Sequence, residues 1–266
     1  MMMFERGNII SRLTLLLPLV ILLYGCSTER PAGKTEAEVL YREAVNLSDD
    51  GRNLIAIERL NLIKSKYPYS YYATHAELLH ADILFKQENY LEAVAAYIMF
   101  KDFHPKHEKI SYVVWKIAEA YYHQLPSTHD RDLSVAEQAI KYYNQLLVHY
   151  PKSEHGEQGR KRVEECWQML RAQEKYIADF YYKTKVYDAA IYRYRLIIDN
   201  YKTGPEVQHA AARIIRSAHQ LKSMEQCIEY YTKYQTLLAK EARGEVLDLM
   251  RECRKFPPIV KDKGQG

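Results

Sequence analysis

Apolar side chains recur at helical spacing along most of the chain, whereas the alternation typical of strands is almost absent. The longest such segment is 157–183, which contains no helix breaker after Gly159. Its apolar positions are Val163, Cys166, Trp167, Leu170, Ile177 and Phe180. This pattern predicts a single amphipathic helix of about 27 residues, which would be about 40 Å long.

A second pattern places a small residue at a fixed distance before a proline. Twelve residues separate the members of three pairs, which are Ala56 and Pro68, Ala93 and Pro105, and Ala139 and Pro151. Ala190 and Cys227 take the same place in a fourth and a fifth segment, so the five small positions are 37, 46, 51 and 37 residues apart. In the fourth segment Lys202 replaces the proline, and Gly204–Pro205 ends the helix just beyond.

The residue types in this repeat follow from helix packing. Two antiparallel helices cross closely only where one contact is small, and a large side chain four residues later fills the space on the same face. Proline cannot donate a backbone hydrogen bond and disfavours helix in the residue before it, so it marks the turn. A period in the mid-thirties with these features is the tetratricopeptide pattern.

The sequence therefore predicts an all-α fold, an α-solenoid of about five tetratricopeptide repeats that occupies 36–255. An insertion, 124–132, lengthens a turn in the third repeat. After the fifth repeat, Val246, Leu247, Leu249 and Met250 predict an amphipathic helix that caps the stack. Pro257–Pro258 would stop that helix, and 256–266 is expected to be a disordered tail.

The N-terminus carries a targeting signal rather than part of the fold. Arg6 and Arg12 precede the apolar run 13–23. A helix of that length rises only about 16 Å, too little to span the hydrocarbon of a bilayer, so a transmembrane anchor is the weaker interpretation. The run ends in Leu23-Tyr24-Gly25-Cys26, which resembles the lipobox of bacterial lipoproteins.

This resemblance implies a lipoprotein signal peptide over 1–25 and lipidation of Cys26. A diacylglycerol and an N-acyl chain on Cys26 would give stable anchoring, and no other cofactor is expected. Ser27, where enterobacterial lipoproteins retained in the inner membrane have Asp, points by the same resemblance to the outer membrane. Residues 26–35 are predicted to be a flexible tether. The alternative is an ordinary secretory signal with a chance cysteine.

Charge and motifs narrow the classes of function. The net charge of +4 is spread along the chain, which does not fit the concentrated basic face of a nucleic-acid-binding protein. The histidine clusters 104–108 and 123–132 lack the paired spacing of metal ligands. Neither a phosphate-binding glycine loop nor a nucleophile elbow occurs. The sequence therefore predicts a protein that is not an enzyme and has no metal site.

The 24 tyrosines are the main candidates for interactions. They gather on the repeat helices, as at Tyr69, Tyr71 and Tyr72, and as adjacent pairs such as Tyr142–Tyr143. In each pair one ring is expected to pack while the other faces out, because neighbouring residues point about 100° apart on a helix. Outward tyrosines would give rigid, amphipathic contact area for a peptide partner.

The cysteines leave two interpretations open. Cys166 and Cys227 lie on apolar faces and could pair in an oxidising compartment. Cys227 would equally serve as a free thiol, which satisfies the small-residue position of its repeat. Whether Cys166, Cys227 and Cys253 form a disulfide is not decided by the sequence.

Residues 26 to about 240 resemble the BamD family, lipoproteins of the outer-membrane β-barrel assembly machinery. The resemblance rests on the lipobox, the five repeats and the turns Tyr67-Pro68-Tyr69-Ser70 and Tyr150-Pro151-Lys152-Ser153. Further matches are Arg131-Asp132, Ala136, Ala139, Arg162, Tyr176, Ala178, Tyr181-Tyr182, Tyr187, Ala190-Ile191 and Arg193. Lys202 in place of proline and a longer C-terminal extension depart from the family pattern.

The resemblance implies a lipid-anchored scaffold at the outer membrane, facing the periplasm. Its partners would be the POTRA domains of BamA, other lipoproteins of the machinery and unfolded outer-membrane proteins. Arg193 matches a family position at the BamA contact, although its residue type would equally suit a solvated helix charge. Tyr69, Tyr71 and Tyr72, with residues of the second repeat, would form a groove for the unfolded substrates.

Two other classes of protein remain as alternatives. A pilotin-like tetratricopeptide lipoprotein, which escorts a secretin or pilus component, would share the anchor and the repeats. The Tyr-Pro-x-Ser turns and the Arg131-Asp132 insertion favour the assembly machinery. An envelope enzyme such as a peptidoglycan hydrolase is disfavoured because the sequence offers no catalytic acid, nucleophile or metal set.

Overall fold

A computed structural model describes residues 31–256 of the chain, and this part contains helices and turns but no strand. The α-helices are α2 (Glu36–Asp49), α3 (Asn53–Lys66), α4 (Tyr71–Lys86), α5 (Tyr90–Phe103), α6 (Ile110–His123), α7 (Ser134–His149), α8 (Gly156–Lys183), α9 (Tyr187–Tyr201), α10 (Pro205–Gln220), α11 (Met224–Tyr234) and α12 (Lys240–Cys253). A 3₁₀ turn, η1 (Gln235–Leu237), follows α11. None of these helices combines the length and apolar character of a membrane-spanning segment. The signal peptide predicted over 1–25, the lipidation site predicted at Cys26 and residues 257–266 lie outside the described residues.

The chain divides within α4, between Ile83 and Leu84, into two compact units. In the first unit α2 packs against α3. The N-terminus of α2 is capped by Thr35, whose hydroxyl accepts a hydrogen bond from the amide of Glu38 at 3.2 Å. The core of this unit contains Leu40, Ala44, Leu47, Ala56, Leu60, Ile63, Ala73, Ala76 and Ile83.

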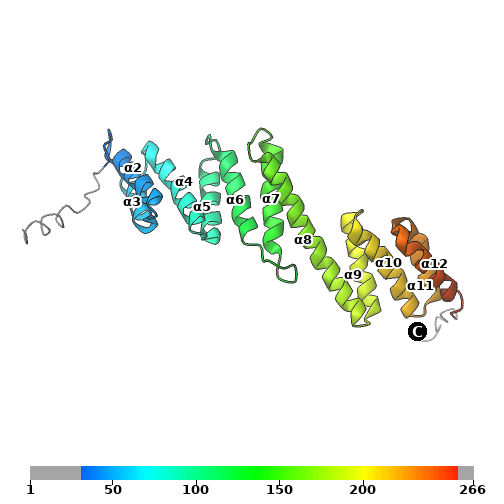
Figure 1. Cartoon of the computed structure of the whole chain (residues 1–266). Coiled ribbons are helices and arrows are strands. Elements are labelled where there is room, and N and C mark those ends of the chain that lie inside the picture. The colour runs from blue at the N-terminus through cyan, green and yellow to red at the C-terminus, as the bar shows by residue number, and fades with distance from the viewer. Residues whose placement is uncertain (1–30, 257–266) are drawn as a thin grey trace, which may run out of the picture. The chain divides into compact units, whose positions relative to one another are not determined.

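In the second unit each helix from α5 to α11 packs against the next one along the chain. The helix predicted over 157–183 is confirmed, because α8 runs unbroken for 28 residues. This helix packs against both α7 and α9, and Figure 1 shows it extending from one to the other. Because α8 is much longer than its neighbours, its middle is flanked by the ends of α7 and α9 rather than by their full lengths.

The predicted repeat is confirmed by the burial of its small positions. All five are completely buried, and they are Ala56, Ala93, Ala139, Ala190 and Cys227. The large side chains four residues later are also completely buried in the first four copies, at Leu60, Tyr97, Tyr143 and Tyr194. In the fifth copy Tyr231 is only half-buried. The fold is therefore a tetratricopeptide solenoid.

The turns between repeats follow the prolines. The helices α3, α5 and α7 each end two residues before their proline, at Lys66, Phe103 and His149. After α9, where proline is missing, Lys202 takes a positive φ of 58° and Gly204 a φ of 116°. Glycine tolerates the second value because it has no Cβ, and Pro205 then starts α10.

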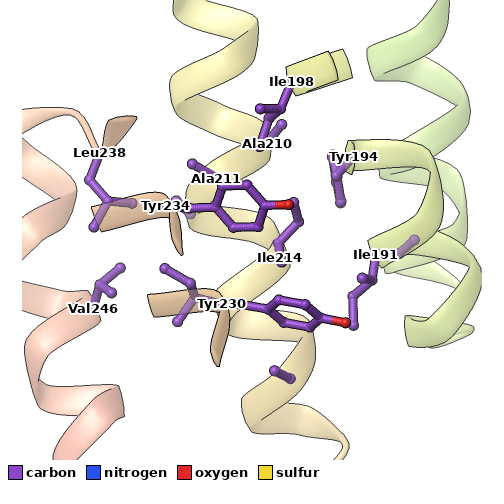
Figure 2. Close-up of a cluster of buried hydrophobic side chains, with 14 of the residues drawn as sticks. Ile191, Tyr194, Ile198, Ala210, Ala211, Ile214, Tyr230, Tyr234, Leu238 and Val246 are labelled. Carbon is purple, nitrogen blue, oxygen red and sulfur yellow. The ribbon is translucent and has the colours of Figure 1, made fainter. Parts of the chain in front are cut away.

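The C-terminal repeats share one core, in which Tyr230 and Tyr234 extend from α11 across α10 (Figure 2). The predicted last helix is α12, and it covers this core with Val246 and Met250. A disulfide joins Cys227 of α11 to Cys253 at the end of α12. This corrects the pairing considered from the sequence, since Cys166 stays a free, buried thiol on α8.

Candidate interaction surfaces

Tyrosines at the start of α4 form an exposed aromatic cluster in the first unit. Tyr69 is fully exposed and Tyr71 is 70% exposed, whereas Tyr72 is half-buried. The ring centroid of Tyr71 lies 4.2 Å from that of His75 and 5.5 Å from that of Tyr72. Tyr41 of α2 joins the cluster at 5.6 Å from Tyr72. The structure thus brings Tyr71 and Tyr72 together with Tyr41 and His75, while Tyr69 stands apart in the turn.

The Tyr-Pro-Tyr-Ser sequence produces this arrangement through its backbone. The amide of Tyr67 closes the last turn of α3, and the amide of Ser70 donates to the carbonyl of Tyr67 at 3.0 Å. The Ser70 hydroxyl then accepts from the amide of Tyr72 at 3.1 Å, which satisfies an otherwise unpaired group at the start of α4. Tyr71 therefore enters the helix facing out and Tyr72 facing in, as the 100° rotation predicts.

The expectation that one ring of each adjacent tyrosine pair faces out is wrong for Tyr142 and Tyr143, which are both buried. The reason is that α7 packs against α6 on one side and α8 on the other, so neighbouring directions are both covered. Tyr142 stacks on Tyr121 of α6 at 5.8 Å between ring centroids. Tyr143 points into a polar cluster that the sequence did not reveal.

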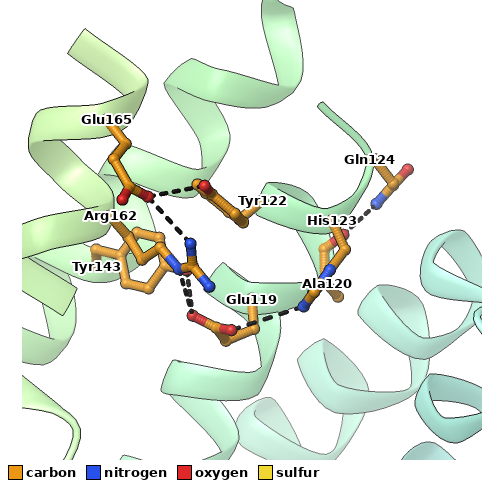
Figure 3. Close-up of polar contacts among 8 residues, drawn as sticks. All are labelled: Glu119, Ala120, Tyr122, His123, Gln124, Tyr143, Arg162 and Glu165. Atoms are coloured by element: carbon orange, nitrogen blue, oxygen red, sulfur yellow. Dashed lines mark hydrogen bonds and ion pairs between the residues drawn. The ribbon is translucent and has the colours of Figure 1, made fainter. Parts of the chain in front are cut away.

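That polar cluster joins α6, α7 and α8 (Figure 3). The buried carboxylate of Glu119 accepts a hydrogen bond from the Tyr143 hydroxyl at 2.5 Å, and Nε of Arg162 lies 3.7 Å from it. Arg162 also donates to Glu165 at 3.0 Å, and its guanidinium covers the ring of Tyr122 at 4.0 Å. Tyr122 donates to the same Glu165 carboxylate at 2.7 Å.

The contacts within this cluster favour the ionised carboxylate of Glu165 and the neutral hydroxyl of Tyr143. Burial raises the pKa of Glu165, but hydrogen bonds from Tyr122 and Arg162 outweigh burial and lower the pKa overall. Burial and the Glu119 carboxylate both raise the pKa of the Tyr143 hydroxyl, which therefore stays a hydrogen-bond donor. The cluster fixes α8 in register against α6 and α7, so we assign it a structural role.

A second polar cluster joins α8, α9 and α10 around Asp179. The Asp179 carboxylate accepts hydrogen bonds from Lys175 at 2.7 Å and from the Tyr194 hydroxyl at 2.5 Å. Nε2 of His209 lies 2.7 Å from the same carboxylate. Burial raises the pKa of Asp179, but these three hydrogen bonds outweigh burial and lower the pKa well below its usual range. Burial lowers the pKa of His209 despite the neighbouring carboxylate.

The insertion 124–132 lies against α8 beside this cluster. The side-chain amide of Gln173 donates to the carbonyl of Arg131 at 2.6 Å, and His129 meets the ring of Tyr176 edge to face at 5.6 Å. A cavity of about 490 Å³ opens there, with Phe180 and Lys183 in its wall. Phe180 is 54% exposed although it belongs to the apolar pattern of α8. Within 31–256, no three His, Cys, Asp or Glu side chains are arranged to hold a metal ion.

Arg193, the predicted partner contact, lies in the middle of α9. Its side chain is half-buried, whereas that of the preceding residue, Tyr192, is exposed and that of the following residue, Tyr194, is buried. No acidic side chain in residues 31–256 forms an ion pair with it, unlike Arg162, Arg171 and Arg216 in the same unit. The position therefore offers an uncompensated guanidinium at the surface of the fourth repeat.

Comparison with known proteins places this arrangement in a family. Residues 34–243 match the family model YfiO, described as "Outer membrane lipoprotein". The chain belongs to this family, which is also the BamD family. It is 28% identical over 207 residues to the outer membrane protein assembly factor BamD of Rickettsia prowazekii, covering 77% of this chain and 82% of that protein. The BamD of Vibrio cholerae is 27% identical, over 86% of this chain and 93% of its own.

Among solved structures, the TPR2AB-domain:pHSP90 complex of yeast Sti1 aligns with a TM-score of 0.44 and 15% identity, covering 83% of this chain and 92% of that one. The family match covers both units of the chain, including the Tyr69–Tyr72 turn and Arg193. It does not extend to the end of α12 or to Cys253, which closes the disulfide.

Proposed function

We propose that this chain is a lipid-anchored scaffold of the outer-membrane protein assembly machinery. The observation that carries the proposal is the family match across 34–243, together with relatives named outer membrane protein assembly factor. Lipid on Cys26 would hold the protein at the outer membrane with its repeats in the periplasm. The protein would act by binding other proteins and not as an enzyme.

The two units would then have different partners. In the first, Tyr69, Tyr71 and the cluster around Tyr72 would contact unfolded outer-membrane proteins. Exposed tyrosines suit this task because they offer large contact area, lose little conformational entropy and keep a hydroxyl for hydrogen bonds. The substrate strands alternate apolar and polar residues, which such a surface can accept without a fixed sequence.

In the second unit, Arg193 would bind an acidic side chain on a POTRA domain of BamA. A half-buried cation without an acidic partner among residues 31–256 is an unfavourable feature for an isolated fold. An acidic partner would compensate it, and the contact would become a partly desolvated ion pair. Such pairs contribute more than exposed ones and are sensitive to charge reversal.

The test is Arg193→Glu with Arg195→Glu as the matched control. Both arginines lie on α9, and Arg195 is exposed two residues further on, where it points to another side of the helix. Arg and Glu have similar helix propensities, so both variants should keep the melting temperature of the wild type. Only Arg193→Glu is expected to lose BamA in a pull-down and to accumulate barrel precursors in the periplasm.

Reversal of the partner acid to arginine should restore binding to Arg193→Glu if the pair is direct. If Arg193→Glu retains BamA at the wild-type level, Arg193 is a solvated charge and the contact lies elsewhere. If neither the wild type nor Arg195→Glu recovers BamA, the scaffold proposal itself fails. The pilotin-like alternative would then be tested by recovery of a secretin.

A further inference from the structure

A pocket of about 370 Å³ lies where the first turn of α7 and the last turn of α9 meet the middle of α8. The pocket is lined by Glu137 of α7, by Trp167, Leu170 and Glu174 of α8, and by Asn200 and Tyr201 of α9. It is distinct from Arg193 and from both polar clusters described above. Trp167 is 38% exposed, so this apolar side chain of α8 is not fully covered by the core.

Two of the residues that line this pocket are aromatic. Trp167 and Tyr201 meet edge to face, with ring centroids 6.2 Å apart and planes inclined at 78°. The face of an aromatic ring carries negative electrostatic potential and attracts cations, guanidinium groups above all. Tyr201 already has the guanidinium of Arg171 at 5.8 Å from its ring, so it tolerates that chemistry.

The charge of the pocket is negative. Glu137 and Glu174 supply two carboxylates, and Oε2 of Glu174 is buried without a hydrogen-bond partner within residues 31–256. Arg171, whose guanidinium lies over the Tyr201 ring, forms its ion pair with Glu164 at 2.5 Å, which leaves Glu137 and Glu174 without an ion pair in residues 31–256. Burial raises the pKa of the Tyr201 hydroxyl, and the carboxylates of Glu174 and Glu137 raise it further, although the Arg171 guanidinium acts in the opposite direction.

The backbone adds to this potential. Asn200 and Tyr201 lie in the last turn of α9, where the helix dipole favours a positive charge. Most helices place Lys, Arg or His in such a turn, but α9 has no basic residue there. Lys202, the C-cap residue of α9, lines a different pocket, so α9 supplies no cation to this one.

We infer that this pocket receives an arginine side chain from a partner protein. A guanidinium is planar, so it can stack on Trp167 or Tyr201 while its edge donates to the unpartnered Glu174 oxygen and to Glu137. Lysine would gain the charge but not the stacking or the paired hydrogen bonds. A zwitterionic lipid headgroup fits less well, because its phosphate would meet the two carboxylates.

The presence of only two tryptophans allows a direct test on the full lipidated chain in detergent. Labelling with 5-fluorotryptophan gives one ¹⁹F resonance for Trp167 and one for Trp115, which stacks on His155 outside the pocket. The probe is the peptide acetyl-Ala-Arg-Ala-amide, titrated into the millimolar range. We expect a saturable shift of the Trp167 resonance alone, and no shift with the citrulline peptide, which has the same shape without the charge.

Glu174→Gln should weaken the arginine peptide about tenfold, because it removes a charged hydrogen-bond acceptor. Glu137→Gln, at an exposed site that cannot disturb packing, should weaken it as well. Glu229→Gln, on the exposed face of α11, is the matched control and should bind as the wild type does. The result is independent of BamA, so it does not depend on the proposed function.

Four results would overturn the inference. The Trp167 resonance could fail to move with the arginine peptide, or could move equally with the citrulline peptide. Equal response to O-phosphoethanolamine would instead identify a lipid headgroup site. Unchanged affinity in both Glu174→Gln and Glu137→Gln, with melting temperatures equal to that of the wild type, would place any binding elsewhere.

Discussion

Reduction of the disulfide between Cys227 and Cys253 is expected to loosen the C-terminal cap without unfolding the repeats before it. The bond joins α11 to α12, and its two cysteines are 26 residues apart and completely buried. Helix α12 packs against α10 and α11. Opening of the cap is therefore a local event, which the disulfide restrains.

The size of the restraint follows from the closed loop. In the chain-entropy description, a cross-link over this separation removes about 3.5 kcal/mol of entropy from the opened state at 25 °C. That corresponds to about 300-fold in the equilibrium between closed and open cap. Since amide exchange in α12 proceeds through the open state, reduction should speed exchange there by up to about 300-fold.

Hydrogen exchange with mass spectrometry, with and without a phosphine reductant, measures this effect. Peptides from α12 should lose protection, whereas peptides from α6 and α7 in the same sample serve as the internal control. Thiol titration of the denatured protein confirms that the bond was intact before reduction and broken after it. Unchanged protection of α12 after complete reduction would refute the reasoning, because the cap would then be held by packing alone.

Three further results are expected. Asp179→Asn should lower the free energy of unfolding by about 2 kcal/mol at pH 7, because three donors lose a charged acceptor. Folding lowers the pKa of Asp179, so its charge stabilises the folded state fully above the ordinary aspartate pKa of about 4. This stabilisation fades as the pH falls towards the folded pKa. The free energies of unfolding of the wild type and Asp179→Asn should therefore converge below pH ~4. Cys26→Ala should move the protein from the membrane fraction to the soluble periplasmic fraction, and equal membrane retention would exclude lipid as the anchor. Tyr69→Ala with Tyr71→Ala should reduce photo-crosslinking to unfolded barrel precursors several-fold at unchanged melting temperature, whereas Leu54→Ala, at another exposed apolar site in the first unit, should leave it unchanged.

The repeat could be predicted from the sequence because its signals are local. A small residue such as Ala93 and the proline twelve residues later lie within one helix and its turn, and helical periodicity fixes the face on which Ala93 lies. The same logic located α8, since nothing after Gly159 interrupts it. The sequence also predicted that one ring of an adjacent pair packs while the other faces out, and this holds for Tyr71 and Tyr72 because neighbouring residues point about 100° apart on a helix.

The polar clusters could not be predicted, because they join helices whose partners are set by packing. Glu119 and Tyr143 are 24 residues apart and Asp179 and His209 are 30 apart, and neither distance carries a pattern. One signal was present at Glu119, a carboxylate within the apolar run Ile117-Ala118-Glu119-Ala120, which should have indicated a buried partner. The choice of Cys253 as the partner of Cys227 likewise depends on where α12 packs.

The exposure of Trp167 and Phe180 could not be predicted from the sequence either. Their spacing matches an apolar helix face, but α8 extends beyond the helices that cover it, and periodicity contains no information about the length of a neighbour. Both side chains now line cavities on α8. Apolar positions that the fold leaves uncovered in this way are candidates for contacts with other proteins.

The most direct test of the scaffold role is the composition of the complex that forms in the cell. The full lipidated protein, purified through a C-terminal tag from membranes in mild detergent, would be analysed by quantitative mass spectrometry. The account predicts BamA in near-stoichiometric amount, together with barrel precursors at lower abundance. Recovery of a secretin or pilus subunit with BamA at background level would contradict it.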